Sequence, residues 1–307
     1  MKKEEHLLLV DGMALLFRAF FATAVRGQYM RNSSGLPTNG VQGFLKHVLL
    51  AAAHKQPTHL AVCWDMGSYT FRNDLFADYK SNRQAPPDEL HPQFDLAKEA
   101  AAAFGLPNVG VPGYEADDCL GTIAKQEHKE RKVTILSGDR DLLQLLDDQL
   151  DVMLLQKGYG NYITYTAETF YEQFAISPRQ FIDVKALMGD PSDGYPGVKG
   201  IGEKTAFKLI KEYGSIEGIL ANIDQLTPSQ QKKMSAGMNV LELSRQLAEI
   251  HCEVPVLWHI EEARWRGVEE EAVRAVEEME LHMLRRQLIQ MNVSMSIKDI
   301  DDPFSSI

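Results

Sequence analysis

Three short apolar runs in this chain each lead into an aspartate. The runs are residues 6–10 before Asp11, residues 59–64 before Asp65, and residues 132–136 shortly before Asp139. Helical patterns separate the runs, and this alternation predicts an α/β fold with a parallel sheet. The ligand crevice of an open parallel sheet lies beyond the carboxyl ends of its strands, so we expect the three aspartates to face one crevice.

The rest of the chain divides into further core helices and a helical part. Core helices are expected over residues 13–24, 40–55, 92–104, 116–131 and 140–146. The polar stretch 67–91 lacks such a pattern, which is usual for a lid, a binding loop or a disordered connector. After about residue 176 the chain is expected to be mostly helical, with Ser177 as an N-cap before Pro178. We therefore expect a core over residues 1–176, a helical part over 177–291 and a flexible tail over 292–307.

Composition excludes several classes of protein. The net charge of -11 argues against a generic basic protein that coats DNA, but divalent cations held by carboxylates would offset part of this charge. Three isolated cysteines, Cys63, Cys119 and Cys252, indicate neither a disulfide framework nor a zinc site. The amino-terminal apolar run is too short for a signal peptide or a membrane span, so we expect a cytoplasmic protein.

Six more acids lie where turns or helix starts are expected. With the three strand-end aspartates they make nine candidates: Asp11, Asp65, Glu115, Asp117, Asp118, Asp139, Asp141, Asp190 and Asp193. Each cluster alone has an ordinary interpretation, because acids are favoured at helix amino termini and aspartate is common in turns. Nine acids at one crevice would repel one another unless cations lay among them. Oxygen ligands without histidine or cysteine favour Mg²⁺ or Mn²⁺, and two such ions are suited to hydrolysing phosphodiesters.

Several motifs occur in the order typical of one nuclease family. They lie at residues 8–12, 17–18, 71–72, 79–83, 112–118, 137–141 and 196–206. Together they resemble the bacterial and phage 5′ nucleases, which include the N-terminal nuclease domain of DNA polymerase I and free-standing flap endonucleases. The resemblance implies a PIN-like α/β core, a helical arch at about 67–92, and a helix-hairpin-helix motif (H3TH-like) at about 190–213. It also implies a Mg²⁺-dependent 5′-3′ exonuclease and flap endonuclease of replication or repair, in free-standing form.

The resemblance further implies roles for individual residues. The first metal ion would be held by Asp11, Asp65, Glu115, Asp117 and Asp118, and the second by Asp139, Asp141, Asp190 and Asp193. The catalytic residues would be Asp11, Asp139, Lys80 and Arg83, the two cations lying on the arch over the scissile phosphate. DNA contacts would come from Arg18, Arg72, Tyr79, Lys80, Arg83, Lys199, Gly200, Gly202 and Lys204, with K⁺ at the hairpin. An arch that is only a solvated loop, and a Gly-rich turn that is only a connector, are the alternatives.

The expected partner is branched, nicked or gapped DNA with a 5′ end, bound by a monomer that works at the nucleoid. In one place the chain departs from the family, which usually has asparagine and an aliphatic residue where this chain has Gly194-Tyr195. Both acids of that turn are kept, so we expect ligation to be kept as well. Two other hypotheses are a catalytically weak flap-binding protein of the same fold and a toxin-like ribonuclease, although the latter chains are shorter and lack the arch and the hairpin.

Overall fold

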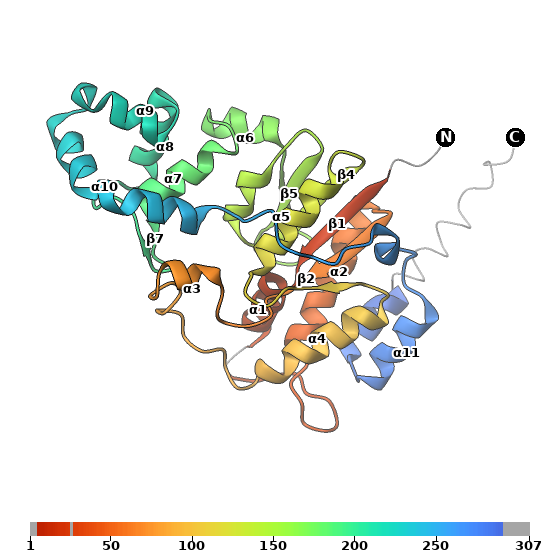
Figure 1. Cartoon of the computed structure of the whole chain (residues 1–307). Helices are drawn as coiled ribbons and strands as arrows, with labels where there is room; N and C mark the ends of the chain where they lie inside the picture. Colours follow the sequence, from red (N-terminus) through yellow and green to blue (C-terminus); the bar gives the residue numbers. More distant parts are fainter. Residues whose placement is uncertain (1–4, 25–26, 291–307) are drawn as a thin grey trace, which may run out of the picture.

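A six-stranded sheet lies at the centre of the computed structural model, which describes residues 5–24 and 27–290 (Figure 1). The strands are β1 (His6–Asp11), β2 (His59–Cys63), β3 (Asn108–Val109), β4 (Lys132–Ser137), β5 (Leu150–Leu155) and β6 (Tyr162–Tyr165). Their order is β3-β2-β1-β4-β5-β6, and all neighbours are parallel except β5 and β6. The three predicted strands are thus confirmed as adjacent members β2, β1 and β4 of one sheet.

Both faces of the sheet are buried, which explains why its strands read as continuous apolar runs. Along β1, Leu7 and Leu9 point to one face and Leu8 and Val10 to the other, and all four are fully buried. The helices α1 (Gly12–Thr23), α2 (Asn39–Lys55), α4 (His91–Ala103) and α11 (Glu270–Glu278) cover the second face, and α5 (Ala116–Glu127) packs on the first. The α/β expectation is confirmed.

The predicted core helices are present, with two differences. The segment expected to be helical at 140–146 is a 3₁₀ helix, η1 (Arg140–Leu145), and α5 ends at Glu127 rather than near residue 131. The sequence pattern did not indicate β3, β5 or β6, although β5 is an interior strand.

The helical arch expected at about 67–92 is helical only at its two ends. The short helix α3 (Phe71–Leu75) lies at its start, α4 begins at His91, and the residues between them form turns. Lys80 has a left-handed backbone with φ of 56°, and its N–H donates to the Asp193 carbonyl at 2.7 Å. The tip of this segment is therefore docked on the acidic turn at 190–193 instead of forming a helix.

The helical part begins close to the expected boundary, whereas α11, near its expected end, packs on the core. Helix α7 (Gln180–Met188) starts two residues after Pro178, which corrects the predicted N-cap. It is followed by a hairpin of β7 (Gly189–Asp190) and β8 (Tyr195–Pro196), then by helices α8 (Glu203–Tyr213), α9 (Ile216–Ala221) and α10 (Pro228–Ala248). Helix α6 (Ala167–Phe174) precedes α7, and two further 3₁₀ turns are η2 (Ile223–Gln225) and η3 (Ile260–Ala263).

After α10 the chain returns to the α/β core. Figure 1 shows α8, α9 and α10 to one side of the sheet, whereas α11 lies beside α4. Leu281 and Leu284 pack into the same apolar cluster as α2 and α4. The expected tail at 292–307 lies outside the described residues. Within the described part of the chain, no helix is long and apolar enough to cross a membrane.

Candidate active site

Asp11 lies at the carboxyl end of β1 and caps the helix that follows. Its carboxylate accepts hydrogen bonds from the Ala14 N–H at 2.9 Å and from the Ser137 hydroxyl at 2.5 Å. The residue is only 4% exposed. Because Ser137 ends the neighbouring strand β4, its hydroxyl fixes the Asp11 carboxylate to the adjacent strand.

Four more acids converge on the same end of the sheet. Asp65 follows β2 and accepts from the Ala116 N–H at 2.7 Å, which ties it to the start of α5. Glu115 caps that helix and Asp117 lies in its first turn. Asp139 follows β4 and caps η1. The structure therefore confirms that the aspartates after the three predicted strands lie together at the carboxyl end of the sheet.

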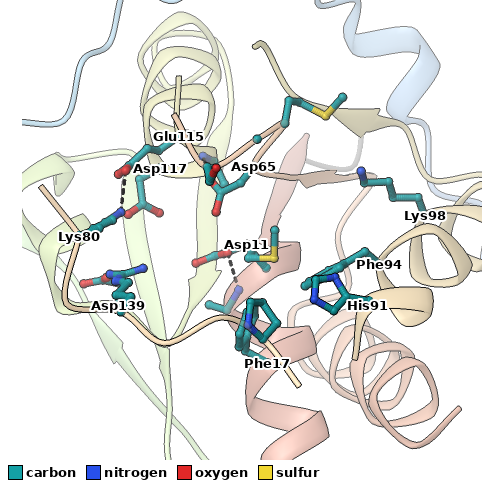
Figure 2. A pocket seen from close by; sticks show the side chains of 18 residues that line it. Asp11, Phe17, Asp65, Lys80, His91, Phe94, Lys98, Glu115, Asp117 and Asp139 are labelled. Carbon is teal, nitrogen blue, oxygen red and sulfur yellow. Dashed lines mark hydrogen bonds and ion pairs between the residues drawn. The ribbon is translucent and has the colours of Figure 1, made fainter. Parts of the chain in front are cut away.

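These five acids line a cavity of about 650 Å³. Figure 2 shows Asp11, Asp65, Asp117 and Asp139 pointing into it, with Lys80 beside Glu115. The opposite wall is formed by aromatic side chains of α1 and α4 and by a lysine: Phe17, His91, Phe94 and Lys98. The cavity thus has an acidic side and a largely apolar side.

A second group of acids lies next to this cavity. Among the described residues, Asp141, Asp190 and Asp193 bring three carboxylate oxygens within 4.8 Å of one another. Asp139 and Asp117 line both the main cavity and the hollow that reaches Asp141 and Asp193. The resemblance grouped Asp139 with the second ion only, whereas in the structure it faces both groups.

Burial raises the pKa of the carboxylates in the first group. The pKa of Asp11 rises to about 7, with the nearby charges of Asp65 and Asp139 adding to burial and the Ser137 hydroxyl opposing it. Burial, together with the charges of Asp11 and Asp139, places the pKa of Asp117 well above its ordinary value. The pKa of Asp65 is also raised by burial. Negative charge at this site is therefore costly without cations.

The second group is partly neutralised by a buried lysine of α7. Lys185 Nζ lies 2.8 Å from Asp141 Oδ1 and 2.5 Å from Asp190 Oδ2. Burial raises the pKa of Asp190, but hydrogen bonds from Lys185 and Ser192 outweigh it and lower that pKa to about 2. Burial and the charge of Asp139 raise the pKa of Asp141 to about 7 despite the lysine. The charged form is therefore more favoured at Asp190 than at Asp141.

The docked segment, which runs from α3 to the start of α4 (residues 71–91), supplies cations that contact both groups of acids. Lys80 Nζ lies 2.6 Å from Glu115 Oε1, and Arg83 Nη2 lies 2.5 Å from Asp193 Oδ1. Burial lowers the pKa of Lys80, but the charges of Glu115 and Asp193 outweigh it, so the pKa lies above its ordinary value. Lys80 and Arg83 are therefore charged at neutral pH and line the cavity together.

Asp118 and Arg72 do not line the main cavity, although both were predicted to belong to the site. The two form a buried bidentate ion pair, and Asp118 also accepts from the N–H groups of His251 and Glu115. Asp118 is fully buried and Arg72 is 2% exposed. Asp118 therefore has no free oxygen to offer a metal ion, and Arg72 has no surface to offer DNA.

Two other predicted DNA contacts have different surroundings from those expected. Tyr79 is 4% exposed, packs against Ile182 and Leu247, and directs its hydroxyl to Glu115 and Asp193 at 3.2–3.3 Å. Its ring is therefore covered and cannot stack on a base in this arrangement, which corrects that prediction. Arg18 is half-buried, donates to the Gln156 carbonyl and does not line the cavity. Its contact with DNA stays a prediction.

The Gly-rich turn precedes α8 at the surface. Lys199, Gly200, Gly202 and Lys204 are all exposed. Gly200 has a left-handed backbone with φ of 85°, whereas Gly202 has φ of -98°, so only Gly200 needs glycine for its conformation. Lys233 Nζ donates to the Gly200 carbonyl at 3.0 Å, so this carbonyl already has a cationic partner.

Ser137 and Lys185 contact the acids of the site but were not predicted as site residues. Ser137 belongs to the motif at residues 137–141, and its position at the end of a predicted strand is the sequence feature that could have indicated its role. Lys185 lies five residues before Asp190 in a helix that ends at the acidic turn, and that spacing was its only sign in the sequence.

Comparison with known proteins agrees with this geometry. A family model described as the 5′-3′ exonuclease N-terminal resolvase-like domain matches residues 6–175, and one described as the 5′-3′ exonuclease C-terminal SAM fold matches residues 176–271. The 5′-3′ exonuclease of Bacillus subtilis (strain 168) is 58% identical over 286 residues, covering 93% of this chain and 97% of that protein.

More distant relatives include a longer polymerase and a bacteriophage nuclease of the same fold. DNA polymerase I of Bacillus caldotenax is 39% identical over 90% of this chain, which spans only 31% of the polymerase. A solved structure of the bacteriophage T5 flap endonuclease with DNA and metal ions has a TM-score of 0.65 at 24% identity, covering 93% of this chain and 98% of that one. Since both family models match in order and together span most of the sequence, this chain belongs to the 5′-3′ exonuclease family.

Proposed function

We propose that this chain is a Mg²⁺-dependent, structure-specific 5′ nuclease that hydrolyses DNA as a 5′-3′ exonuclease and a flap endonuclease. The observation that carries this proposal is the convergence of acids from β1, β2, β4 and α5 on one cavity, with Lys80 and Arg83 in its wall. Phosphodiester hydrolysis needs divalent cations to neutralise charge and basic groups to bind phosphate. The cavity has both kinds of residue within one space.

The residues present fit divalent cations. Every candidate ligand is a carboxylate, which favours Mg²⁺ or Mn²⁺ over softer metals. The raised pKa values of Asp11, Asp117 and Asp141 are a cost that a divalent cation would remove. We propose two ions, the first held by residues among Asp11, Asp65, Glu115, Asp117 and Asp139, and the second by Asp141, Asp190 and Asp193.

The ions would supply the electrophilic part of the reaction when bound, by polarising the phosphodiester and lowering the pKa of the attacking water. The protein's own residues bind and orient the strand. Lys80 would exchange its partner Glu115 for a phosphate oxygen, whose negative charge grows in the transition state. Arg83, half-exposed at the cavity rim, would bind a neighbouring phosphate. Phe17 and Phe94 restrict water on the apolar side of the cavity.

Duplex DNA would bind to the helical part. Lys199 and Lys204 are exposed beside the Gly-rich turn and can pair with backbone phosphates, and K⁺ could bridge a carbonyl of this turn to the DNA. The partner would be a branched, nicked or gapped duplex with a 5′ end, bound by a monomer. The flap endonuclease solved with DNA and metal ions supports this choice of ligand by analogy of fold.

Cleavage of matched 5′-labelled substrates tests the proposal. A flap, a nick, a gap and a single strand are compared with Mg²⁺ and with a chelator. We expect Mg²⁺-dependent cleavage of the flap near its junction, with slower cleavage of the single strand. Tight flap binding without cleavage in Mg²⁺ or Mn²⁺ would instead identify a binding protein of the same fold.

A further inference from the structure

Lys185 brings a positive charge into the second carboxylate group from inside the protein. Its side chain is 8% exposed, and its ammonium lies 2.8 Å from Asp141 Oδ1 and 2.5 Å from Asp190 Oδ2. These two acids belong to the trio, completed by Asp193, whose oxygens lie within 4.8 Å of one another. The lysine ammonium thus contacts two of the three carboxylates that would bind a divalent cation there.

The first carboxylate group has a different charge balance. Glu115 has cationic partners, Lys80 at 2.6 Å and Arg72 at 3.6 Å. In the part of the chain that the structure describes, no side-chain nitrogen of lysine, arginine or histidine lies within 4.0 Å of a carboxylate oxygen of the other four acids, Asp11, Asp65, Asp117 and Asp139. In the second group every member has a cationic partner, since Arg83 pairs with Asp193 and Lys185 with the other two. The two groups therefore cannot attract divalent cations equally.

The two cationic partners of the second group also differ in mobility. Arg83 is 52% exposed on the docked segment and can leave Asp193 for solvent or a phosphate. Lys185 projects from α7, whose neighbours Val184 and Ala186 are fully buried in the core. Its ammonium can move only as far as its flexible stem allows, so it stays close to the acids in any arrangement.

We propose that Lys185 and a divalent cation compete for Asp141 and Asp190, so that the second ion binds more weakly than the first and after it. This inference rests on the proposed function, because it assumes that both carboxylate groups bind cations. An ammonium and a divalent cation that share the same oxygens repel each other at close range. Lys185 would therefore set the affinity of the second ion and thereby the cation concentration at which two ions are present.

Calorimetric titration with Mn²⁺ tests the proposal in the full-length protein without DNA. Wild type is compared with Lys185→Met and Lys185→Gln, which remove the charge, and with Lys185→Arg, which keeps it. A matched control is Lys132→Met, because Lys132 pairs with the buried Asp151 at 2.7 Å at the opposite edge of the sheet. We expect one tight and one weak ion in wild type, and a second-ion Kd about tenfold lower in both neutral variants. Lys185→Arg and Lys132→Met should keep the wild-type values.

Thermal melting gives a second measurement, because the neutral variants lack a charge between two carboxylates and are less stable without cations. Mn²⁺ should raise their Tm by more than it raises that of wild type. The proposed competition is overturned if both neutral variants have a second-ion Kd equal to or higher than that of wild type. If the first ion still binds in that case, the proposed function is not affected. Wild-type protein that binds no Mn²⁺ overturns both.

Discussion

Arg72 and Asp118 form a solvent-excluded ion pair that joins three parts of the chain. Two guanidinium nitrogens lie 2.8 Å from the two carboxylate oxygens. Arg72 also donates to the carbonyls of Leu247 and Glu249 at the end of α10, and Asp118 accepts from the His251 N–H. The pair therefore fixes the start of the docked segment, the acidic helix α5 and the end of the helical part around one point.

Arg72→Met should lower the free energy of unfolding by about 3–5 kcal/mol, because it leaves a buried carboxylate without its partner. Urea denaturation measures this change. The control is Arg285→Met, which removes an ion pair with Glu277 whose members are about half exposed, and it should cost at most about 1 kcal/mol. Equal effects of the two substitutions would show that the buried pair has no special role.

Stability without divalent cations should fall as pH rises from about 4 to about 7. The folded protein keeps protons on Asp11 and Asp141 up to about pH 7, whereas the unfolded chain releases them near 3.8. In this interval the folded state binds more protons, so the free energy of unfolding decreases with pH and then levels off. Asp190, with a pKa of about 2, contributes the opposite dependence only below this interval.

Denaturation in a chelator at several pH values measures this dependence. At pH 8, Asp11→Asn and Asp141→Asn should each have a higher free energy of unfolding than wild type. At pH 5 this difference from wild type should be smaller. Mg²⁺ should stabilise wild type more at pH 8 than at pH 5 and stabilise the variants less. If the free energies of unfolding of wild type and variant differ by the same amount at every pH, the assigned pKa values are contradicted.

Lys80→Ala should lower single-turnover cleavage of a flap on the order of 10²-fold, as for the loss of one preorganised donor. Ground-state affinity should change much less, since the duplex contacts assigned to the helical part remain. The control is Lys129→Ala, an exposed lysine just beyond the far end of α5. If Lys80→Ala weakens binding but cuts at the wild-type rate once saturated, Lys80 is only a peripheral phosphate contact.

Gly200→Ala and Gly202→Ala should differ in stability although the residues are two positions apart. Gly200 has a positive φ, and a Cβ there would lie 3.1 Å from Lys233 Cε, so its substitution should cost about 1 kcal/mol or more. A Cβ on Gly202 meets nothing within 4 Å at an ordinary φ, so stability should be nearly unchanged. Gly202→Val should nevertheless weaken duplex binding if the backbone approaches phosphate there, which a filter-binding assay measures.

The sequence predicted the acidic cavity because one simple rule governs it. Each strand that ends in an aspartate places that aspartate at the same edge of the sheet, and Asp11, Asp65 and Asp139 follow this rule. The spacing of Glu115 and Asp118 also predicts that both carboxylates lie on one face of a helix, but this prediction is less reliable. Glu115 is the N-cap, with φ of -89° and ψ of 162°, so it lies outside the helix. Its side chain lines the cavity, whereas Asp118 is fully buried.

Other features depend on contacts between distant parts of the chain. The pairing of Arg72 with Asp118 and of Lys185 with Asp141 joins residues more than 40 positions apart, and no local pattern indicates such pairs. The docked conformation of Lys80 similarly depends on a backbone hydrogen bond to Asp193. Sequence reasoning therefore identified which residue types surround the site but not which charges neutralise one another.

The most direct test of the account compares two buried aspartates at opposite ends of the parallel strands. Asp11→Asn removes a carboxylate from the cavity, and Asp151→Asn removes one that is 6% exposed and pairs with Lys132 at 2.7 Å. Single-turnover cleavage of a 5′-labelled flap is measured in Mg²⁺, and flap affinity is measured in Ca²⁺ by fluorescence anisotropy. We predict that Asp11→Asn lowers the cleavage rate on the order of 10²-fold or more with its affinity kept, and that Asp151→Asn cleaves like wild type. Wild-type cleavage by Asp11→Asn would contradict the assignment of this cavity as the metal-dependent active site.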